Sequence, residues 1–263
     1  MRRVGDEELM PRFRAQVPNP VHEKTSAFDV CSEADEAAEA RLSAGLTGLF
    51  PAALIVGEES TGHDPAMIAK MGEAGTAFLI DPIDGTKNFT SGVPLFGTMI
   101  AGLSAGEIVF AAIHDPVCDD TALAVRGGGA WLRRANGEEV RLRVSPPCAP
   151  EQMNIVAGTN FLPAHLRPVV QENLPKFGMN FWLRCAAHEY RLAASGHCEL
   201  LAYNKLMPWD HAAGWLLHRE AGGHSAHFDG SDYKPVHTTG GLICAPDPDS
   251  WQVARDCLLT DRR

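Results

Sequence analysis

The spacing of hydrophobic positions changes along the chain, and the predicted secondary structure changes with it. Near the start, apolar and alanine positions recur three or four residues apart over residues 5–14 and again over 32–49. This spacing predicts two amphipathic helices. The middle of the chain instead carries short apolar runs bounded by Gly or Pro, at 52–56, 77–80, 98–103 and 108–113. Short runs with such boundaries predict strands, so we expect a sheet there.

Turn residues predict an antiparallel component and a break between two halves. The segment SAGE (104–107) predicts a hairpin, and glycine-rich turns precede the alternating strand VRLRV (140–144). The segment SPPCAP (145–150) contains two adjacent prolines, which lack backbone donors and interrupt any regular element. We therefore predict an N-terminal α+β half over residues 1–146 and a C-terminal α/β half over residues 147–263.

The C-terminal half mixes strand and helix signals. The apolar runs NIVAG (154–158) and GLICA (241–245) predict strands. Helical spacing is found around 185–196 and from about 211 to 221, where the pair Gly222-Gly223 ends the pattern. This half is therefore expected to be a smaller α/β unit.

Composition and charge exclude several classes of function. The formal net charge of −10 opposes binding to nucleic acid and to anionic membranes, so a polyanionic substrate would need a bridging cation. The seven cysteines contain no C-x-x-C pair and indicate neither a disulfide framework nor a zinc site, as expected in a reducing cytoplasm. The start MRRVGDEELM lacks the apolar segment of a signal peptide, and no apolar run is long enough to span a bilayer. We expect neither export nor membrane insertion.

Two carboxylates follow the apolar run at 77–80. In FLIDPIDGTKNF, Asp81 and Asp84 lie just past a predicted strand, where a turn through Pro82 can direct both toward one point. Like charges held together need a proton or a cation between them. The alternative is structural, with Asp81 capping a turn and Asp84-Gly85 serving only as a turn dipeptide.

A second acidic pair, Glu58-Glu59, follows the apolar run at 52–56 in the same way. Two neighbouring strands that end in carboxylates build an oxygen-ligand site of the kind that Mg²⁺ prefers. One of the two acids, Glu59, is equally well explained as a solvated loop residue. The pattern favours a magnesium site, and the other motifs described below strengthen the case for Glu58 as a ligand.

A third acid occurs in PWDHAAG (208–214), just before a predicted helix. Asp210 is well placed as a helix N-cap, but a cap can also be a ligand if its second oxygen faces the site. The histidines His211 and His188 have no second histidine at ligand spacing, so we expect them to be packed or at the surface rather than metal ligands.

Taken together, the acidic motifs resemble the signatures of the inositol monophosphatase family of Mg²⁺-dependent phosphatases. The three motifs occur in the family's order as GEES (57–60), DPIDGTKNF (81–89) and WDHAAG (209–214). The similarity extends over nearly the whole chain, to KTSAFDVCSEAD (24–35), GGGAW (127–131) and EAGG (220–223). The resemblance implies an α+β fold, a layered αβαβα sandwich with the site between the halves, and a lithium-sensitive homodimer.

The resemblance also implies roles for individual residues. Two or three Mg²⁺ ions are expected as cofactors, held by the carboxylates of Glu58, Asp81, Asp84 and Asp210 and the carbonyl of Ile83. Asp35 matches the family's acid near a weakly held third metal, and Lys24 matches a nearby basic residue.

The implied reaction is attack of a metal-activated water on a phosphate monoester, without a covalent phosphoenzyme. In the family the water is activated through a Glu and a Thr, which match Glu58 and Thr86, and Asp84 belongs to the same catalytic cluster. Backbone N–H groups of Gly85 and Thr86, where GTKNF begins a helical turn, are expected to hold the phosphate.

The residues expected to contact the substrate depart from the family. Tyr203 stands seven positions before Asp210, where inositol-specific members have an acid that binds sugar-like hydroxyls, and Asp210 itself is expected to contact the substrate. In CAAHEY (185–190), Cys185 replaces a hydroxyl donor beside the substrate, and Ala186 follows it.

These departures leave several substrates open. A small polyol or sugar monophosphate is the first expectation. However, SGVPLFGT (91–98) resembles the matching stretch of histidinol-phosphate phosphatases, and Lys87 is a basic choice seen there and in 3′(2′),5′-bisphosphate nucleotidases. A further alternative is a regulatory binding protein with a vestigial phosphatase site. The expected partner is otherwise a small phosphorylated metabolite.

Overall fold

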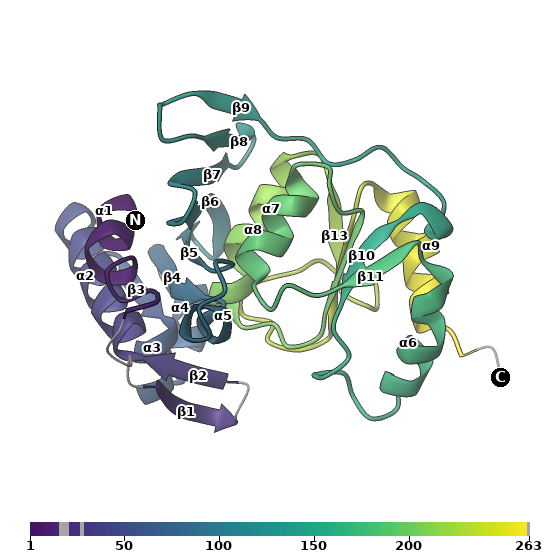
Figure 1. Cartoon of the computed structure of the whole chain (residues 1–263), viewed down its shortest axis with the longest axis horizontal. Helices are drawn as coiled ribbons and strands as arrows, with labels where there is room; N and C mark the ends of the chain where they lie inside the picture. The colour runs from purple at the N-terminus through teal and green to yellow at the C-terminus, as the bar shows by residue number, and fades with distance from the viewer. Residues whose placement is uncertain (16–20, 27–28, 262–263) are drawn as a thin grey trace.

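The protein is built from alternating layers of helices and sheets, seen in a computed structural model that describes residues 1–15, 21–26 and 29–261. One outer layer contains the helices at the start of the chain, the middle layer contains α7 and α8 between two sheets, and the other outer layer contains α6 and α9 (Figure 1). The helices of these layers are α1 (Arg2–Val4), the π-helix η1 (Gly5–Leu9), α2 (Glu33–Leu49), α6 (Arg167–Asn173), α7 (Ala186–Ala194), α8 (Pro208–Glu220) and α9 (Pro248–Leu259). The predicted layered αβαβα, α+β fold is therefore confirmed.

The larger sheet has seven strands in the order β3-β4-β5-β6-β7-β8-β9. Its strands are β3 (Leu54–Gly57), β4 (Thr76–Asp84), β5 (Gly97–Ser104), β6 (Glu107–Asp115), β7 (Asp120–Val125), β8 (Gly129–Arg133) and β9 (Glu139–Arg141). Only β3 and β4 are parallel neighbours, while the other neighbours pair antiparallel. Ser104 pairs with Glu107, which confirms the predicted hairpin.

The last strand of this sheet is shorter than the predicted strand over 140–144. β9 ends at Arg141, and the N–H of Val144 donates to the carbonyl of Ala221 just past α8. This bond draws the chain away from the sheet edge, and the prolines that follow cannot donate to a ladder. The chain then crosses to the smaller sheet, which begins at Asn154.

The smaller sheet has five strands in the order β11-β10-β12-β14-β13. The strands are β10 (Asn154–Ala157), β11 (Met179–Phe181), β12 (Leu200–Tyr203), β13 (His224–Ala226) and β14 (Leu242–Ala245). β10 pairs parallel with both β11 and β12, whereas β14 is antiparallel to β12 and to β13. The carboxyl ends of β10, β11 and β12 therefore lie along one edge of the sheet.

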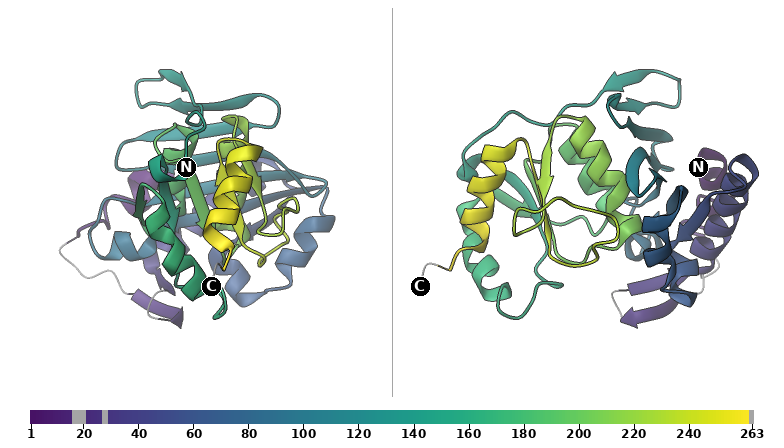
Figure 2. Two further views of the ribbon diagram at one scale, coloured as in Figure 1. Left: turned by 90° about the vertical axis from the view of Figure 1, so that its right-hand side faces the viewer. Right: turned by 180° about the vertical axis from the view of Figure 1, so that it is seen from behind.

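Strand β4 shows how the sequence pattern produces the layers. Ala77 and Leu79 belong to the apolar cluster that includes α7 and α8, whereas Phe78 and Ile80 belong to the cluster that includes α2. Alternate side chains of a strand point to opposite faces, so an apolar residue at each position buries both faces. A view from behind shows the same order of layers (Figure 2). Burying each Leu or Ile contributes roughly 1.5–3 kcal/mol.

The apolar cluster around α7 and α8 draws residues from both sides of the Pro-rich segment. It contains Met99 of β5, Val156 of β10 and Leu216 of α8. The two sheets thus share one core, and a boundary between residues 146 and 147 stays a prediction. Among the described residues no helix combines the length and the apolar character needed to cross a bilayer.

The start of the chain differs from the predicted helix over 5–14. Helix α1 passes into η1, in which the N–H of Met10 donates to the carbonyl of Gly5, and regular helix ends there because Pro11 has no N–H. The helix predicted over 32–49 is confirmed as α2, which follows Ser32. The short elements that remain are β1 (Val21–Ser26), β2 (Asp29–Ser32), α3 (Glu58–His63), α4 (Met67–Glu73), α5 (Thr86–Thr90), η2 (Pro150–Gln152) and η3 (Leu174–Lys176).

Candidate metal-binding active site

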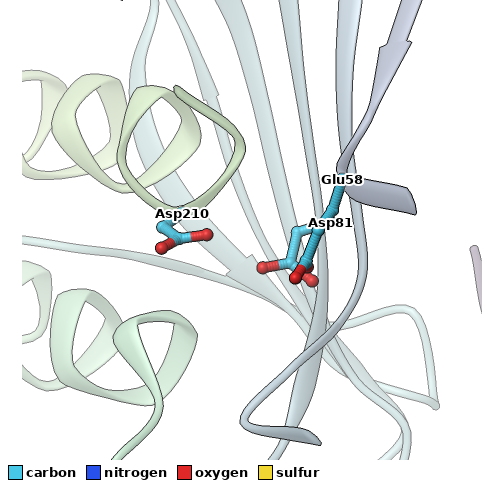
Figure 3. Close-up of side chains that lie close together, drawn as sticks. All are labelled: Glu58, Asp81 and Asp210. Carbon is cyan, nitrogen blue, oxygen red and sulfur yellow. The ribbon is translucent and has the colours of Figure 1, made fainter. Parts of the chain in front are cut away.

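Three carboxylates meet where the larger sheet faces the start of α8 (Figure 3). Glu58 opens α3 directly after β3, Asp81 lies on β4, and Asp210 lies in the first turn of α8. One carboxylate oxygen of each lies within 4.8 Å of the others. Because β3 and β4 pair in parallel, with Gly57 opposite Ile80, the strands deliver Glu58 and Asp81 at the same edge. The prediction that neighbouring strands bring these two acids together is confirmed.

The backbone around Asp81 and Asp84 is a bulged strand rather than the predicted turn beyond a strand end. β4 continues to Asp84, and the pairing shifts from Asp81 opposite Met99 to Asp84 opposite Gly97. Three steps on β4 therefore match two on β5, which is the definition of a bulge. The Thr98 hydroxyl donates to the carbonyl of Pro82 at 2.9 Å and holds the bulge. Bulges commonly redirect side chains beside active sites.

Asp81 is the most deeply buried of the three converging acids. Its side chain is only 1% exposed, and Oδ1 has no hydrogen-bond partner among the residues that the structure describes. Burial raises the pKa of Asp81 well above its usual value, and the charges of Glu58, Asp84 and Asp210 raise it further. A buried carboxylate oxygen that lacks a donor needs a proton or a cation. A set of oxygen donors of this kind fits Mg²⁺.

Asp84 lies beside this group but outside the three carboxylates that converge. Its Oδ2 accepts hydrogen bonds from the Cys185 thiol at 3.1 Å and from the N–H of Ala187, at the start of α7. Burial raises the pKa of Asp84 to about 6, while the Ala187 N–H, the Cys185 thiol and the Gly85 N–H act in the opposite direction. The metal-binding role of Asp84 therefore stays a prediction, with one oxygen already held by α7.

Thr86 and Asp35 form a contact at the edge of the site. The Thr86 hydroxyl lies 2.9 Å from the carbonyl of Ile83 and 3.2 Å from Asp35 Oδ1. Asp35 is buried, and its Oδ2 accepts from the N–H and the hydroxyl of Ser32 at 2.8 and 2.6 Å, which caps α2. Burial is the largest cause that raises the pKa of Asp35 to about 7, and the charge of Glu58 adds to it.

The predicted helical turn after the acidic motif is confirmed as α5. Gly85 precedes it with φ of +87°, a conformation that favours glycine. A Cβ atom at this position would lie 2.9 Å from the carbonyl oxygen of Leu95 and 3.1 Å from Cys185 Cβ. The site therefore needs glycine here both for its dihedral angle and for space. Phosphate binding by the N–H groups of Gly85 and Thr86 stays a prediction.

The other residues expected to contact the substrate lie at the start of α7 and at the end of β12. Cys185 is buried at the N-cap of α7, and Ala186 is the first residue of that helix. Tyr203 ends β12, and its hydroxyl donates to Glu189 Oε2 at 2.8 Å. Burial raises the pKa of Glu189 to about 7, although its hydrogen bonds from Tyr203 and from Leu183 lower it. Tyr203, which stands in place of the family's acid, is thus hydrogen-bonded to a different acid, Glu189.

Two supporting residues were not predicted from the sequence. Buried Glu39 of α2 accepts the N–H of Glu59 at 2.7 Å and of Ser60 at 2.9 Å, and so holds the first turn of α3, which carries Glu58. Asn88 of α5 donates to the carbonyls of Leu95 and Leu183 at 2.8 and 2.7 Å. Glu39 could have been noticed as a carboxylate beside Ala38 on the apolar face of the helix over 32–49.

The predictions for Asp210 and for His211, the histidine that follows it, have different outcomes. Helix α8 begins at Pro208 with Met207 as its N-cap, so the N-cap interpretation of Asp210 is wrong. Pro at the first position preorganises the helix, and Asp210 lies in the turn where the helix dipole favours a carboxylate. His211 is packed, as predicted, because Nδ1 contacts the Tyr190 hydroxyl at 3.1 Å and Nε2 the Lys205 carbonyl at 2.9 Å.

His188 and Lys24 are the two remaining residues singled out in the sequence. Of the two placements expected for His188, packed or at the surface, the structure shows the packed one, since its Nε2 contacts the carbonyl of Phe96 at 3.1 Å. Lys24 lies in β1, but its side chain is outside the part of the chain whose side chains are described.

Fold and site together define a layered α+β enzyme with an oxygen-ligand centre. The family model of the inositol monophosphatase family matches residues 3–263. The inositol-1-monophosphatase of Rhizobium meliloti is 33% identical over 82% of this chain and 78% of its own length. The histidinol-phosphatase of Chlorobaculum parvum is 32% identical over 81% and 78%. The crystal structure of the extragenic suppressor protein suhB from Bartonella henselae, 28% identical, superposes with a TM-score of 0.81 and covers 97% of this chain and 94% of that one.

The chain belongs to the inositol monophosphatase family and is a phosphoric monoester hydrolase. The resemblance first seen in three short motifs thus extends over the whole fold.

Proposed function

We propose that this protein hydrolyses small phosphate monoesters with two or three Mg²⁺ ions. The buried carboxylate of Asp81 is the observation that carries the proposal, because Oδ1 has no hydrogen-bond donor among the described residues while two other acids lie within 4.8 Å. Glu58, Asp81 and Asp210 would hold the metal together with Asp84 and the carbonyl of Ile83. Bound Mg²⁺ would neutralise phosphoryl oxygens, lower the pKa of the attacking water and stabilise the leaving alkoxide.

The hydroxyl of Thr86 is placed to move a proton. Thr86 lies next to Gly85, where the phosphate is expected to bind, and its Oγ1 lies 3.2 Å from Asp35 Oδ1. A water on the other side of this hydroxyl could give its proton to Thr86 while Thr86 gives its own to Asp35. The raised pKa of Asp35, about 7, makes it a suitable base near neutral pH. Glu58 remains a second candidate base for the same water.

The substrate is proposed to be a small phosphorylated metabolite. Polyol and sugar monophosphates follow from the name of the Rhizobium relative, and histidinol phosphate from the name of the Chlorobaculum relative. A 3′(2′),5′-bisphosphate nucleotide is the third class, because Lys87 follows Thr86.

From the family we also expect a homodimer and inhibition by lithium. We also propose a cytoplasmic location, where thiols stay reduced, and the six cysteines whose side chains are described are free.

The proposal is tested by phosphate release from a panel of monoesters, with Mg²⁺ and with a chelator. The panel contains inositol 1-phosphate, histidinol phosphate, adenosine monophosphates, 3′-phosphoadenosine 5′-phosphate, fructose 1,6-bisphosphate and β-glycerophosphate. We expect release that needs Mg²⁺ and differs in kcat/KM between substrates. Protein that binds Mg²⁺ but releases phosphate from none of them would contradict the proposal and favour the regulatory binding protein.

Removing the Thr86 hydroxyl tests the proton path. Thr86→Ala is expected to lower kcat roughly a hundredfold, the usual contribution of a positioned proton carrier, with a smaller change in KM. Thr90→Ala is the matched control on the same short helix, because its hydroxyl bonds only the carbonyl of Lys87, at 3.3 Å, among the contacts described. Equal effects of the two substitutions would show that the α5 backbone, not the Thr86 hydroxyl, matters.

A further inference from the structure

Three segments gather at the carboxyl edge of the parallel strands in the smaller sheet. The register places Val156 opposite both Phe181 and Leu201, so β10, β11 and β12 end side by side. The segments that leave these ends carry Phe161, Trp182 and Lys205 respectively. Ligands of open α/β sheets bind outside the carboxyl ends of their strands.

Contacts join the segment after β10 to each of the other two segments. The side-chain amide of Asn204 donates to the carbonyl of Phe161 at 2.6 Å, and Lys205 Nζ lies 5.7 Å from the Phe161 ring centroid. A Cβ atom at Gly158 would lie 3.9 Å from the indole of Trp182. We name this surface, formed by Phe161, Trp182 and Lys205, the aromatic rim.

The two rings of the rim are exposed although they are large and apolar. Phe161 is 50% exposed and Trp182 is 44% exposed. Exposed aromatic side chains beside a catalytic centre are characteristic of ligand-binding surfaces.

The rim is continuous with the proposed active site. Leu183, directly after Trp182, accepts a hydrogen bond from Asn88 of α5 at 2.7 Å and donates its N–H to Glu189 at 2.9 Å. Cys185, three residues after Trp182, contacts Asp84. The chain therefore passes from the exposed indole to the acidic centre within four residues.

We infer that the aromatic rim binds a flat heteroaromatic ring carried by the leaving group of the substrate. This inference rests on the proposed function and narrows it to one substrate class. Exposed Trp and Phe faces stack on planar rings, whereas hydroxyl-rich polyols are recognised by acids and amides. The Tyr203 hydroxyl already donates to Glu189, so it offers one neutral acceptor oxygen where the carboxylate expected for a polyol would offer two charged ones. Purine and imidazole rings are the two sources of such a ring.

The first test compares kcat/KM for ring-bearing and ring-free monoesters. Adenosine monophosphates represent the purine, histidinol phosphate the imidazole, and inositol 1-phosphate and β-glycerophosphate the ring-free esters. In Trp182→Ala and Phe161→Ala, the ratio of ring-bearing to ring-free kcat/KM is expected to fall roughly tenfold, the value of one stacked ring. Trp182→Phe should keep most of the ratio, and Met179→Ala, an equally exposed apolar residue on β11, should not change it.

The second test does not need turnover. Adenosine is titrated into the protein while tryptophan fluorescence is followed, and saturable quenching that disappears in Trp182→Phe supports the rim. If the ratio falls for only one of the two ring-bearing substrates, the rim binds the ring of that substrate. An unchanged ratio in both alanine variants, or quenching that persists in Trp182→Phe, would overturn the inference. If no monoester releases phosphate, the proposed function fails, and the adenosine titration still decides whether the rim binds a ring.

Discussion

Replacing Asp81 with Asn is expected to lower kcat for phosphate monoester hydrolysis by about a thousandfold or more. Metal ions contribute several kcal/mol to the stabilisation of the transition state, and each 1.36 kcal/mol corresponds to about a tenfold change in rate. Asp81 is the buried member of the three converging carboxylates, so the neutral amide removes one negative charge and one ligand oxygen from the proposed metal site. The measurement is kcat at saturating Mg²⁺ with the preferred substrate of the panel.

The same substitution is expected to stabilise the metal-free protein at pH 8. Asn has nearly the same volume as Asp but cannot ionise. Folding of the variant therefore no longer has to bury a negative charge beside other acids. The melting temperature with a chelator should therefore rise by a few degrees while Mg²⁺ no longer raises it as much. Asp256→Asn, an exposed acid on α9, is the control for both readouts. Loss of activity together with loss of metal-free stability would indicate a folding role instead.

The stabilisation of the protein by Mg²⁺ is expected to grow steeply as pH rises from 5 to 8. The folded, metal-free protein raises the pKa of Asp84 to about 6 and that of Asp81 well above its usual value, mainly through burial. The folded state thus holds protons that the unfolded chain has already lost, and the stability from these protons disappears as pH rises through the raised pKa values. Mg²⁺ must displace the same protons, so its binding weakens at low pH.

The measurement is the difference in melting temperature with and without Mg²⁺ at each pH. Burial lowers the pKa of His211 and His218 to about 4, which gives stability a slope of the opposite sign between about pH 4 and 6.5, because only the unfolded chain protonates them there. Neither histidine is among the proposed metal ligands, so we expect their contributions to cancel in the difference. Asp81→Asn should flatten the dependence. A difference that stays constant from pH 5 to 8 would contradict proton-linked metal binding.

The parts of this protein that the sequence predicts well are those set by neighbouring residues. The apolar runs at 77–80 and 98–103 became adjacent strands, because every position in them is buried on one face or the other. Glu58 and Asp81 could be expected to meet because both come at the ends of two consecutive apolar runs, Glu58 after a single glycine and Asp81 directly. The bulge between Asp81 and Asp84 was missed, since Pro82 and Gly85 favour a turn equally well.

What the sequence did not predict depends on contacts between distant segments. Glu39 lies about twenty residues before the N–H groups that it caps, and Asn88 bonds a carbonyl 95 positions away. No local periodicity marks either partner. The aromatic rim could not be predicted for the same reason. Phe161 and Trp182 are far apart in the sequence, and only the parallel pairing of β10 with β11 brings their segments together.

The hydrogen bonds from α3 to Glu39 make the position of Glu58 depend on a helix that carries none of the three converging acids. Helix α2 belongs to the outer layer, yet its buried carboxylate fixes the turn that presents Glu58. The glycine before Glu58 leaves room for that carboxylate, because a side chain at Gly57 would overlap it. Selectivity between cations of different size is therefore adjustable from the outside of the molecule. A library directed at the packing of α2 could retune ionic preference while every coordinating residue is left intact.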